Sequence, residues 1–387
     1  MDPYGGRDGE QDMDRDDELY AALRLRLAEG VGPVLFGRLI EAFGSPAGAL
    51  SAGAASWRGV EGIGAKTAEA IAAVTDEQVD AELAEADLHG VRIIHDNDQS
   101  YPASLKNIYD RPPVLYVRGS LEPADALAVA VVGARRCTHY GLEQAERFGE
   151  LLGRAGFTVV SGGARGIDAA AHRGALAAGG RTIAVMGCGL SSFYPPENRK
   201  LFEQIVAGGH GALVSELPMK TAVLGGNFPT RNRIISGLSL GVLVIEAARR
   251  SGAIITAGQA AEQGRVVFAL PGRVDSPTSQ GSNELIRNGA IMASCLEDIL
   301  EHLGQVGRSM AVDEEAAGEF VAPAGLNDAE KKLIETLREA PAVLDELVRR
   351  SGLPSAKVIS TMTMLVIKGA ATQQPGNVFS LRTQKSP

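Results

Sequence analysis

The sequence predicts an α/β protein with a doubly wound, mostly parallel sheet, a helical domain before the sheet and a winged helix after it. Short, continuous apolar runs alternate with helical patterns over the middle of the chain. A purely helical pattern from Leu19 to about Asp87 precedes them, and three helical patterns followed by a hairpin pattern come after them. Continuous apolar strands separated by helices are typical of a parallel sheet that is covered on both faces.

Length and charge distribution predict several domains. The chain has 387 residues, of which 45% are hydrophobic, more than one ordinary core needs. Residues 1–18 carry eight acidic and two basic residues without apolar periodicity, so we expect a disordered tail. The predicted segments are an acidic tail at 1–18, a helical domain at 19–95, a sheet domain at 96–300, an acidic linker at 301–325 and a winged helix at 326–387.

Each predicted strand of the sheet is a short apolar run. The runs are Leu127–Val132, Phe157–Val160, Thr182–Met186, Ala212–Val214, Gly241–Ile245, Val266–Leu270 and Ala290–Met292. The winged-helix pattern consists of helices at Asp328–Glu339, Val343–Ser351 and Ser355–Lys368 and a hairpin from Gly369 to Leu381. In the helical domain, Gly30-Val31-Gly32 and Gly62-Ile63-Gly64 resemble helix-hairpin-helix turns, which serve either as helix connectors, the reading we favour, or as backbone contacts to DNA phosphates.

Composition excludes several classes of protein. No apolar run approaches the roughly 20 residues that cross a bilayer, so we expect a cytoplasmic protein without membrane contact. The three cysteines have no CxxC spacing, the six histidines have no metal-ligand spacing, and no dinucleotide fingerprint is present. We therefore expect neither a metal nor a cofactor. Residues 124–300 hold 17 basic and 14 acidic residues, so the net charge of −9 does not exclude a polyanionic partner.

Two loops at predicted strand ends combine glycine with arginine. Leu127–Val132 leads into Gly133-Ala134-Arg135-Arg136, and Phe157–Val160 leads into Ser161-Gly162-Gly163-Ala164-Arg165-Gly166-Ile167-Asp168. A loop of small residues between a strand and a helix presents the unpaired N–H groups of the first helical turn to an anion. An arginine in this loop adds a charged guanidinium with several N–H donors. For one such loop alone the favoured alternative is a tight turn whose glycines serve only packing and whose arginine is solvated. Two loops place Arg135 and Arg165 at one rim of the sheet and favour a phosphodiester ligand.

A third element is Phe228-Pro229-Thr230-Arg231-Asn232-Arg233. Its two arginines lie in the first turn of a predicted helix, where cations oppose the helix dipole, so each needs an anion. That anion is either a DNA phosphate or an internal carboxylate such as Glu216 or Glu246, and the sequence favours neither. Ser251-Gly252-Ala253-Ile254-Ile255-Thr256 follows the fifth predicted strand and offers further N–H groups and hydroxyls.

Catalysis is not indicated by the residue pattern. His172 lies four residues after Asp168 and would share a helix face with it, so the two could act as a general acid–base pair. A helix-capping aspartate and a hydrogen-bonded histidine are the favoured alternative. Because the sequence contains no other nucleophile–base pair, metal cluster or P-loop, we predict that the protein is not an enzyme.

The order of these motifs resembles the DprA/Smf family. The matching motifs are Val131–Arg135, Ser161–Asp168 with Ala171-His172, Gly187-Cys188-Gly189 with Tyr194-Pro195, Phe228–Arg233, Ser251–Thr256, and Pro271-Gly272 with Gly281-Ser282-Asn283. The resemblance implies a Rossmann-like, homodimeric protein with a SAM/helix-hairpin-helix-like N-terminal domain. It also implies binding of single-stranded DNA that enters during natural transformation, protection of that DNA, and help in loading RecA onto it.

The predicted DNA-binding residues come from the loops described above. They are Gly133, Arg135, Ser161, Gly162, Gly163, Arg165, Gly166, Arg231, Asn232, Arg233, Ser251, Gly252 and Thr256. Two positions depart from the family pattern: Gly163, where a larger apolar residue is commoner, and Ala134, which often is serine.

Two other functional classes compete with this interpretation. Phosphoribohydrolases of similar fold carry a Pro-Gly-Gly-x-Gly-Thr-x-x-Glu motif, and this chain has Ser251–Thr256 in its place, without the glycine pair or the acid. A winged-helix transcription regulator is the other class. Its recognition-helix candidate, Ser355–Lys368, contains only Lys357 and Lys368 as basic residues, so few phosphate contacts would come from it.

Overall fold

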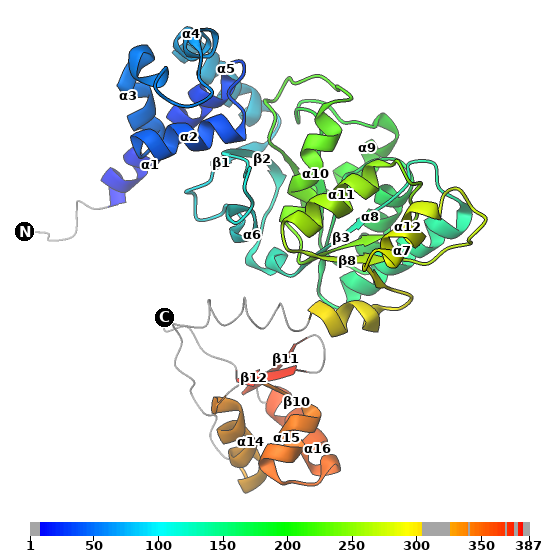
Figure 1. Cartoon of the computed structure of the whole chain (residues 1–387). Coiled ribbons are helices and arrows are strands. Elements are labelled where there is room, and N and C mark those ends of the chain that lie inside the picture. Colours follow the sequence, from blue (N-terminus) through cyan, green and yellow to red (C-terminus); the bar gives the residue numbers. More distant parts are fainter. Residues whose placement is uncertain (1–7, 304–325, 340, 368–369, 375–377, 382–387) are drawn as a thin grey trace, which may run out of the picture. The chain divides into compact units, whose positions relative to one another are not determined.

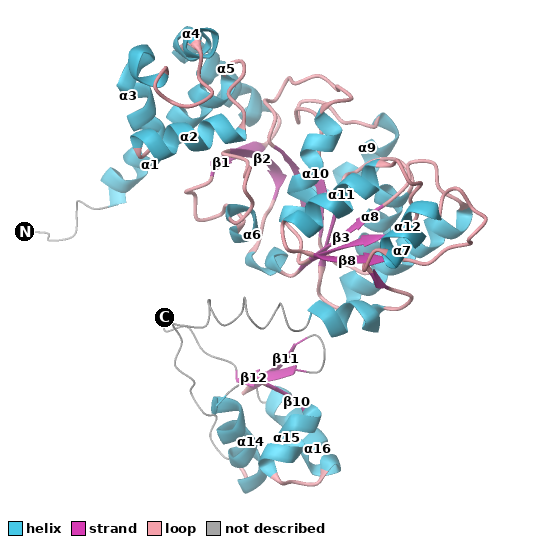
Figure 2. Cartoon of the chain, in the orientation of Figure 1, coloured by secondary structure: helices cyan, strands magenta, loops and turns pink. Residues whose placement is uncertain are grey.

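The computed structural model describes residues 8–303, 326–339, 341–367, 370–374 and 378–381 (Figure 1). The chain forms two compact units, Met1–Ser294 and Cys295–Pro387. The first unit contains a helical domain and a nine-stranded sheet with helices on both faces (Figure 2). The described part of the second unit contains a helix at 296–303, followed by a small three-stranded sheet with three further helices. Among the described residues, no helix is both long and apolar enough to cross a membrane.

Five helices form the N-terminal domain. They are α1 (Asp8–Leu27), α2 (Pro33–Phe43), α3 (Pro46–Trp57), α4 (Ala65–Ala73) and α5 (Asp76–Leu88). The prediction of a disordered tail is wrong for residues 8–18, which form the beginning of α1, and residues 1–7 lie outside the described part. Gly32 and Gly64 are the N-caps of α2 and α4, so both glycine turns connect helices as the sequence suggested.

The sheet contains all seven predicted strands and two that the sequence analysis missed. In chain order they are β1 (Val91–His95), β2 (Val114–Gly119), β3 (Ala128–Val132), β4 (Thr158–Ser161), β5 (Thr182–Val185), β6 (Gly211–Ser215), β7 (Gly241–Val244), β8 (Val266–Ala269) and β9 (Ile291–Met292). Their spatial order is β1-β2-β6-β5-β4-β3-β7-β8-β9. The missed strands β1 and β2 pair antiparallel with each other, and β2 pairs antiparallel with β6; the other neighbours are parallel.

Helices cover both faces of this sheet. They are α7 (His139–Arg154), α8 (Ile167–Ala177), α9 (Arg199–Ala207), α10 (Asn227–Gly237), α11 (Gly252–Glu262) and α12 (Gln280–Arg287), with shorter elements α6 (Ala103–Lys106), η1 (Pro123–Ala126) and η2 (Pro196–Asn198). Alternate strand residues face opposite sides. Val132, Val185 and Val214 pack with α10 and α11 in one core cluster. Ala184 and Leu213 pack with α8, α9 and the N-terminal helices in the other.

The sheet has its topological switch point at β3. The chain proceeds from β3 to β4, β5 and β6 on one side, and then returns to β7, β8 and β9 on the other. In doubly wound sheets the crevice at the carboxyl ends of the strands beside such a point binds ligands. The strand order therefore places a candidate site at the ends of β3 and β7.

The second unit has the winged-helix arrangement that the sequence predicts. Its elements are α14 (Asp328–Glu339), β10 (Ala342–Val343), α15 (Leu344–Ser351), α16 (Ser355–Ile367), β11 (Ala371–Gln374) and β12 (Val378–Leu381), with sheet order β10-β12-β11. Leu333, Leu347, Val358 and Phe379 belong to its core. Of the predicted linker, residues 301–303 are helical and residues 304–325 lie outside the described part.

Candidate nucleic-acid interface

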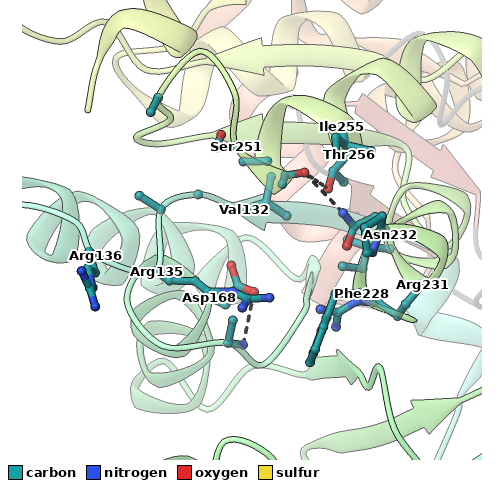
Figure 3. A pocket seen from close by; sticks show the side chains of 18 of the residues that line it. Val132, Arg135, Arg136, Asp168, Phe228, Arg231, Asn232, Ser251, Ile255 and Thr256 are labelled. Carbon is teal, nitrogen blue, oxygen red and sulfur yellow. Dashed lines mark hydrogen bonds between the residues drawn. The ribbon is translucent and has the colours of Figure 1, made fainter. Parts of the chain in front are cut away.

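A pocket of about 720 Å³ opens at the carboxyl ends of β3 and β7 (Figure 3). Residues 133–136 after β3, the start of α8, the first half of α10 and the start of α11 line it. The structure brings together seven of the predicted DNA-binding residues in this lining: Gly133, Arg135, Arg231, Asn232, Ser251, Gly252 and Thr256. Gly162 and Arg165 line a smaller adjoining pocket, which Arg135 also lines.

The loop after β3 presents Arg135 to solvent at the pocket mouth. The residues of β3 are all buried, and Gly133 follows where the chain passes close to α8. A Cβ atom at Gly133 would lie 2.6 Å from Cγ1 of Ile167 and 2.9 Å from the carbonyl oxygen of Glu246, so no larger residue fits. The guanidinium of Arg135 lies 4.8 Å from the ring centroid of Phe228, a cation–π distance.

Arg231 is the buried cation of the pocket, with 4% of its surface exposed. Its Nη1 donates a hydrogen bond to the carbonyl oxygen of Gly162 at 2.7 Å and another to the carbonyl oxygen of Val185. Burial lowers the pKa of Arg231 to about 10, and the negative charge of Asp168 acts against this shift. Its Nε is buried without a hydrogen-bond partner among the described residues. Arg231 thus remains cationic at neutral pH with incompletely satisfied donors.

Position 162 has no room for a residue larger than glycine, because the Arg231 side chain fills the space beside it. A Cβ atom at position 162 would lie 2.6 Å from Nη2 of Arg231 and 2.7 Å from Oδ2 of Asp168. Two other loop glycines are required for conformation: Gly163 has φ of 63° and Gly166 has φ of 78°, where side chains are strained. At position 163 a Cβ atom would also lie 2.9 Å from the ring of Phe202, which accounts for glycine in place of a larger apolar residue.

Asp168 lies inside the loop where the sequence suggested a phosphate. Its Oδ2 accepts the backbone N–H of Ala164 at 3.3 Å, and the residue is 7% exposed. Burial raises the pKa of Asp168 above its usual value, while the charges of Arg231 and Arg135 act in the opposite direction. The Asp168 carboxylate therefore takes a backbone N–H group of the loop that a phosphate would otherwise bind, and a phosphate can contact only the outer part of the loop.

Ser161 and His172 make internal contacts. Ser161 is buried, and its hydroxyl donates to the carbonyl oxygen of Val131 at 2.6 Å, so its side chain does not face either pocket. His172 is fully buried, and its Nδ1 lies 2.6 Å from Oγ1 of Thr182. Burial lowers the pKa of His172 to about 3, so it is neutral at physiological pH. His172 lies outside the lining of the pocket that contains Asp168, in keeping with the packing alternative.

Arg233 resolves the choice that the sequence left open for the third element. Its Nη1 and Nη2 donate to the two carboxylate oxygens of Glu216, both at 2.7 Å, and its Nε lies 2.9 Å from Oδ2 of Asp110. The side chain is 3% exposed. Residues two apart on a helix point to different sides, so Arg231 faces the pocket and Arg233 faces this internal pair. The prediction of Arg233 as a DNA contact is thus replaced by the salt-bridge alternative.

Glu246, the other carboxylate considered as an arginine partner, binds a different group. It accepts the backbone N–H of Thr138 at 2.9 Å and the Thr138 hydroxyl at 2.6 Å. The same hydroxyl accepts the N–H of Gly141 and caps α7. Glu246 therefore fixes the loop that carries Arg135.

Arg165 is exposed but already paired. Its Nε and Nη2 donate to Oε1 of Glu197 at 2.9 and 2.6 Å. The neighbouring Asn198 amide donates to the carbonyl oxygens of Gly163 and Ala164 at 2.9 and 3.2 Å. Through these contacts η2 fixes the position of the loop at residues 162–166. Glu197 also occupies the guanidinium N–H groups of Arg165 that a phosphate would bind.

The sequence analysis missed the aromatic residues of the site. The rings of Tyr194 and Phe228 lie 5.8 Å apart between centroids, and both residues line the two pockets. Phe228 also lies 5.9 Å from the guanidinium of Arg231. Both residues belong to motifs named in the sequence analysis, but neither ring was assigned a role there.

Comparisons with known proteins agree with this architecture. Models of three protein families match the chain: DNA recombination-mediator protein A at residues 92–304, the DprA-like N-terminal HHH domain at 16–84, and the DprA winged helix domain at 319–377. Protein Smf of Synechocystis is 36% identical over 385 residues, which cover 92% of this chain and 96% of the relative.

Two solved structures are similar as well. The X-ray structure of DNA processing protein A from Streptococcus pneumoniae has a TM-score of 0.65 and 34% identity, covering 73% of this chain and 97% of that one. A structure of DNA processing protein A from Helicobacter pylori, described for its single-stranded DNA binding mode, has a TM-score of 0.50 and 29% identity, covering 56% of this chain and 96% of that one.

Proposed function

The chain belongs to the DprA/Smf family of DNA-processing proteins, and from this premise we propose that it binds single-stranded DNA in the pocket at the ends of β3 and β7. The observation that supports this most directly is the combination of cationic Arg135 and Arg231 with the rings of Phe228 and Tyr194 around one pocket. The Helicobacter pylori relative, whose structure is described for its single-stranded DNA binding mode, supports the same ligand.

Phosphate contacts would come from three kinds of group. Arg135 offers a charged fork at the mouth. The first turn of α11, beginning at Gly252 with Ser251 as N-cap, directs backbone N–H groups and the positive end of its dipole into the lining. Arg231 adds a buried positive charge, which is screened less by salt than a surface charge.

Single strands are favoured by the aromatic part of the site. Stacking on Phe228 and Tyr194 requires an unpaired base whose face is free, and every base has such a face. A duplex keeps its base faces inside the stack and offers only phosphates to the arginines. Binding should therefore tolerate any base sequence and discriminate against duplex.

Membership in the family supports a wider role. We propose that the protein protects incoming DNA during natural transformation, helps to load RecA onto it, acts in the cytoplasm as a homodimer, and does so without cofactor or catalysis. We also propose the domain limits 19–95, 96–300, 301–325 and 326–387, except that α1 begins at Asp8, β1 (Val91–His95) belongs to the sheet and residues 301–303 are helical.

A gel-shift titration tests the binding proposal. Oligo-dT and a duplex of equal length are compared at several salt concentrations, with Arg135→Ala and the matched control Arg154→Ala, an exposed arginine at the end of α7. We expect tighter binding to oligo-dT, and a loss of about 0.7 from the slope of log K against log salt in Arg135→Ala only. Equal affinity for both DNA forms, or an unchanged Arg135→Ala, would contradict the proposal.

A further inference from the structure

The N-terminal helical domain contacts a wall of the DNA pocket through α5. The wall segment, residues 217–226, runs from the end of β6 to the start of α10 and contributes Val223 and Gly225 to the pocket lining. Oε1 of Glu82 accepts the backbone N–H of Met219 at 2.6 Å. Oε2 of Glu85 lies 2.9 Å from Nζ of Lys220. Two consecutive residues of the wall segment are thus bound by carboxylates one helical turn apart.

The Glu82–Met219 contact is formed in a buried environment, whereas the Lys220 side chain of the other contact is 74% exposed. Met219 is fully buried and belongs to the same hydrophobic cluster as Leu23, Leu39 and other core residues of the helical domain. The Glu85 side chain is 16% exposed. Tyr116 of β2 is also fully buried, and burial together with the charge of Glu82 raises the pKa of its phenol well above the usual value. A carboxylate in such surroundings needs the Met219 N–H as a partner.

The wall segment is hydrogen-bonded to residues 187–194, which we call the facing segment. The carbonyl oxygen of Met219 accepts the backbone N–H of Ser191 at 3.2 Å and its hydroxyl at 2.6 Å. Thr221 accepts the N–H of Gly189 at 3.0 Å. Position 189 must be glycine, because a Cβ atom there would overlap the carbonyl oxygens of Pro218 and Met219. The facing segment ends at Tyr194, which lines the pocket.

We propose that the helical domain has a positioning function in DNA binding: Glu82 and Glu85 of α5 fix the wall segment and, through it, the facing segment that carries Tyr194. This inference rests on the proposed function of the pocket. It gives Glu82 and Glu85 of α5 a role that is compatible with a polyanionic ligand, because Glu82 binds a buried backbone amide and Glu85 is paired with the exposed Lys220. Glu82 and Glu85 are positioning residues, and neither lines the pocket.

Substitutions at Glu82 separate positioning from simple electrostatics. Glu82→Ala removes the acceptor of the Met219 N–H, whereas Glu82→Gln keeps an oxygen acceptor, and both remove one negative charge. Loss of a negative charge alone strengthens binding to a polyanion. Positioning predicts the opposite for Glu82→Ala, a loss of about threefold to tenfold in oligo-dT affinity, the range typical of coupling from outside a site. Glu61→Ala, which removes an exposed carboxylate elsewhere in the helical domain, is the charge control.

The experiment uses the full chain and two readouts. Hydrogen exchange of backbone amides in residues 187–194 and 217–226 is measured without DNA, and oligo-dT affinity is measured by fluorescence anisotropy. We expect faster exchange in both segments and weaker binding for Glu82→Ala, and wild-type exchange for Glu82→Gln and Glu61→Ala. Wild-type exchange and wild-type or tighter binding in a folded Glu82→Ala would overturn the inference.

Two further results keep the outcomes distinct. A wild-type protein that does not bind oligo-dT refutes the proposed function, while the exchange data still decide whether α5 fixes the two segments. Circular dichroism shows whether Glu82→Ala folds. If it does not, Ser191→Ala, which removes only the hydroxyl contact to Met219, decides the matter: faster exchange at residues 187–194 with weaker binding supports the inference, and unchanged values overturn it.

Discussion

Removal of the Glu197 carboxylate should increase the affinity for single-stranded DNA. Glu197 accepts two hydrogen bonds from the Arg165 guanidinium, at 2.9 and 2.6 Å, in the position that a phosphate oxygen would take. The Arg165 side chain is 50% exposed and the Glu197 side chain is 56% exposed, so solvent screens the ion pair and DNA can displace the carboxylate. Glu197→Gln weakens this competition. From the range measured for exposed ion pairs we expect about a twofold to fivefold gain in affinity.

A double-mutant cycle with Arg165→Ala isolates this effect. Affinity for oligo-dT is measured by fluorescence anisotropy at low salt for the wild type, both single variants and the double variant. Arg165→Ala should bind more weakly than wild type, and Glu197→Gln should bring little gain in the Arg165→Ala background because no competing pair remains. An equal gain in both backgrounds would refute the reasoning, since it would reflect only the loss of a negative charge. The gain in the wild-type background should also decrease as salt is raised.

Three other predictions concern stability and domain roles. Arg233→Ala should destabilise the protein by about 3–5 kcal/mol in chemical denaturation, because it leaves the buried Glu216 without its partner; a change below 1 kcal/mol would contradict the buried pair. His172 has a pKa of about 3 when folded, so the stability from keeping it neutral is present above about pH 6.5 and is lost as the pH falls. Between pH 7.5 and 5 the wild type should lose about 2 kcal/mol more than His172→Gln, and parallel curves would exclude this. Deletion of residues 326–387 should leave oligo-dT affinity within about threefold in a gel shift, since the strand-end loops keep their donors; loss of binding in a folded truncation would move the main site to the winged helix.

Five of the seven strands that the sequence predicted, β3 to β7, have every residue buried. A parallel strand covered by helices is a continuous apolar run, and β3 and β7 are examples in which every residue is buried. The missed strands β1 and β2 lie at one edge and pair antiparallel. β1 has an exposed arginine, Arg92, after its first residue, and it follows a helix with only a short turn between them. Such a segment has too little periodicity to separate it from the end of a helical pattern.

The site could be predicted as a set of loops but not as a set of contacts. The partners that decide the role of Arg233, Glu216 and Asp110, lie 17 and 123 residues away in the sequence. Nothing local to the third element identifies them, because only the antiparallel pairing of β2 with β6 and the placement of α10 bring these segments together. For the same reason the sequence could not show that Asp168 fills the inside of its own loop.

The structure gives different environments to three of the arginines that were predicted to bind DNA. Among the described residues, Arg135 forms no ion pair and rests on the ring of Phe228, so DNA can bind it without displacing a carboxylate. Arg165 must first release the Glu197 carboxylate, so the contribution of Arg165 to DNA affinity depends on the salt concentration and on the presence of Glu197. Arg231 is buried and bound to backbone carbonyl oxygens, so its charge is fixed in place before DNA arrives. A preorganised buried cation supports binding at little further cost in side-chain entropy, but the fold also depends on it. Arg135 is therefore the position at which DNA binding can be changed without changing stability, and it is the residue from which the affinity of this site is best measured.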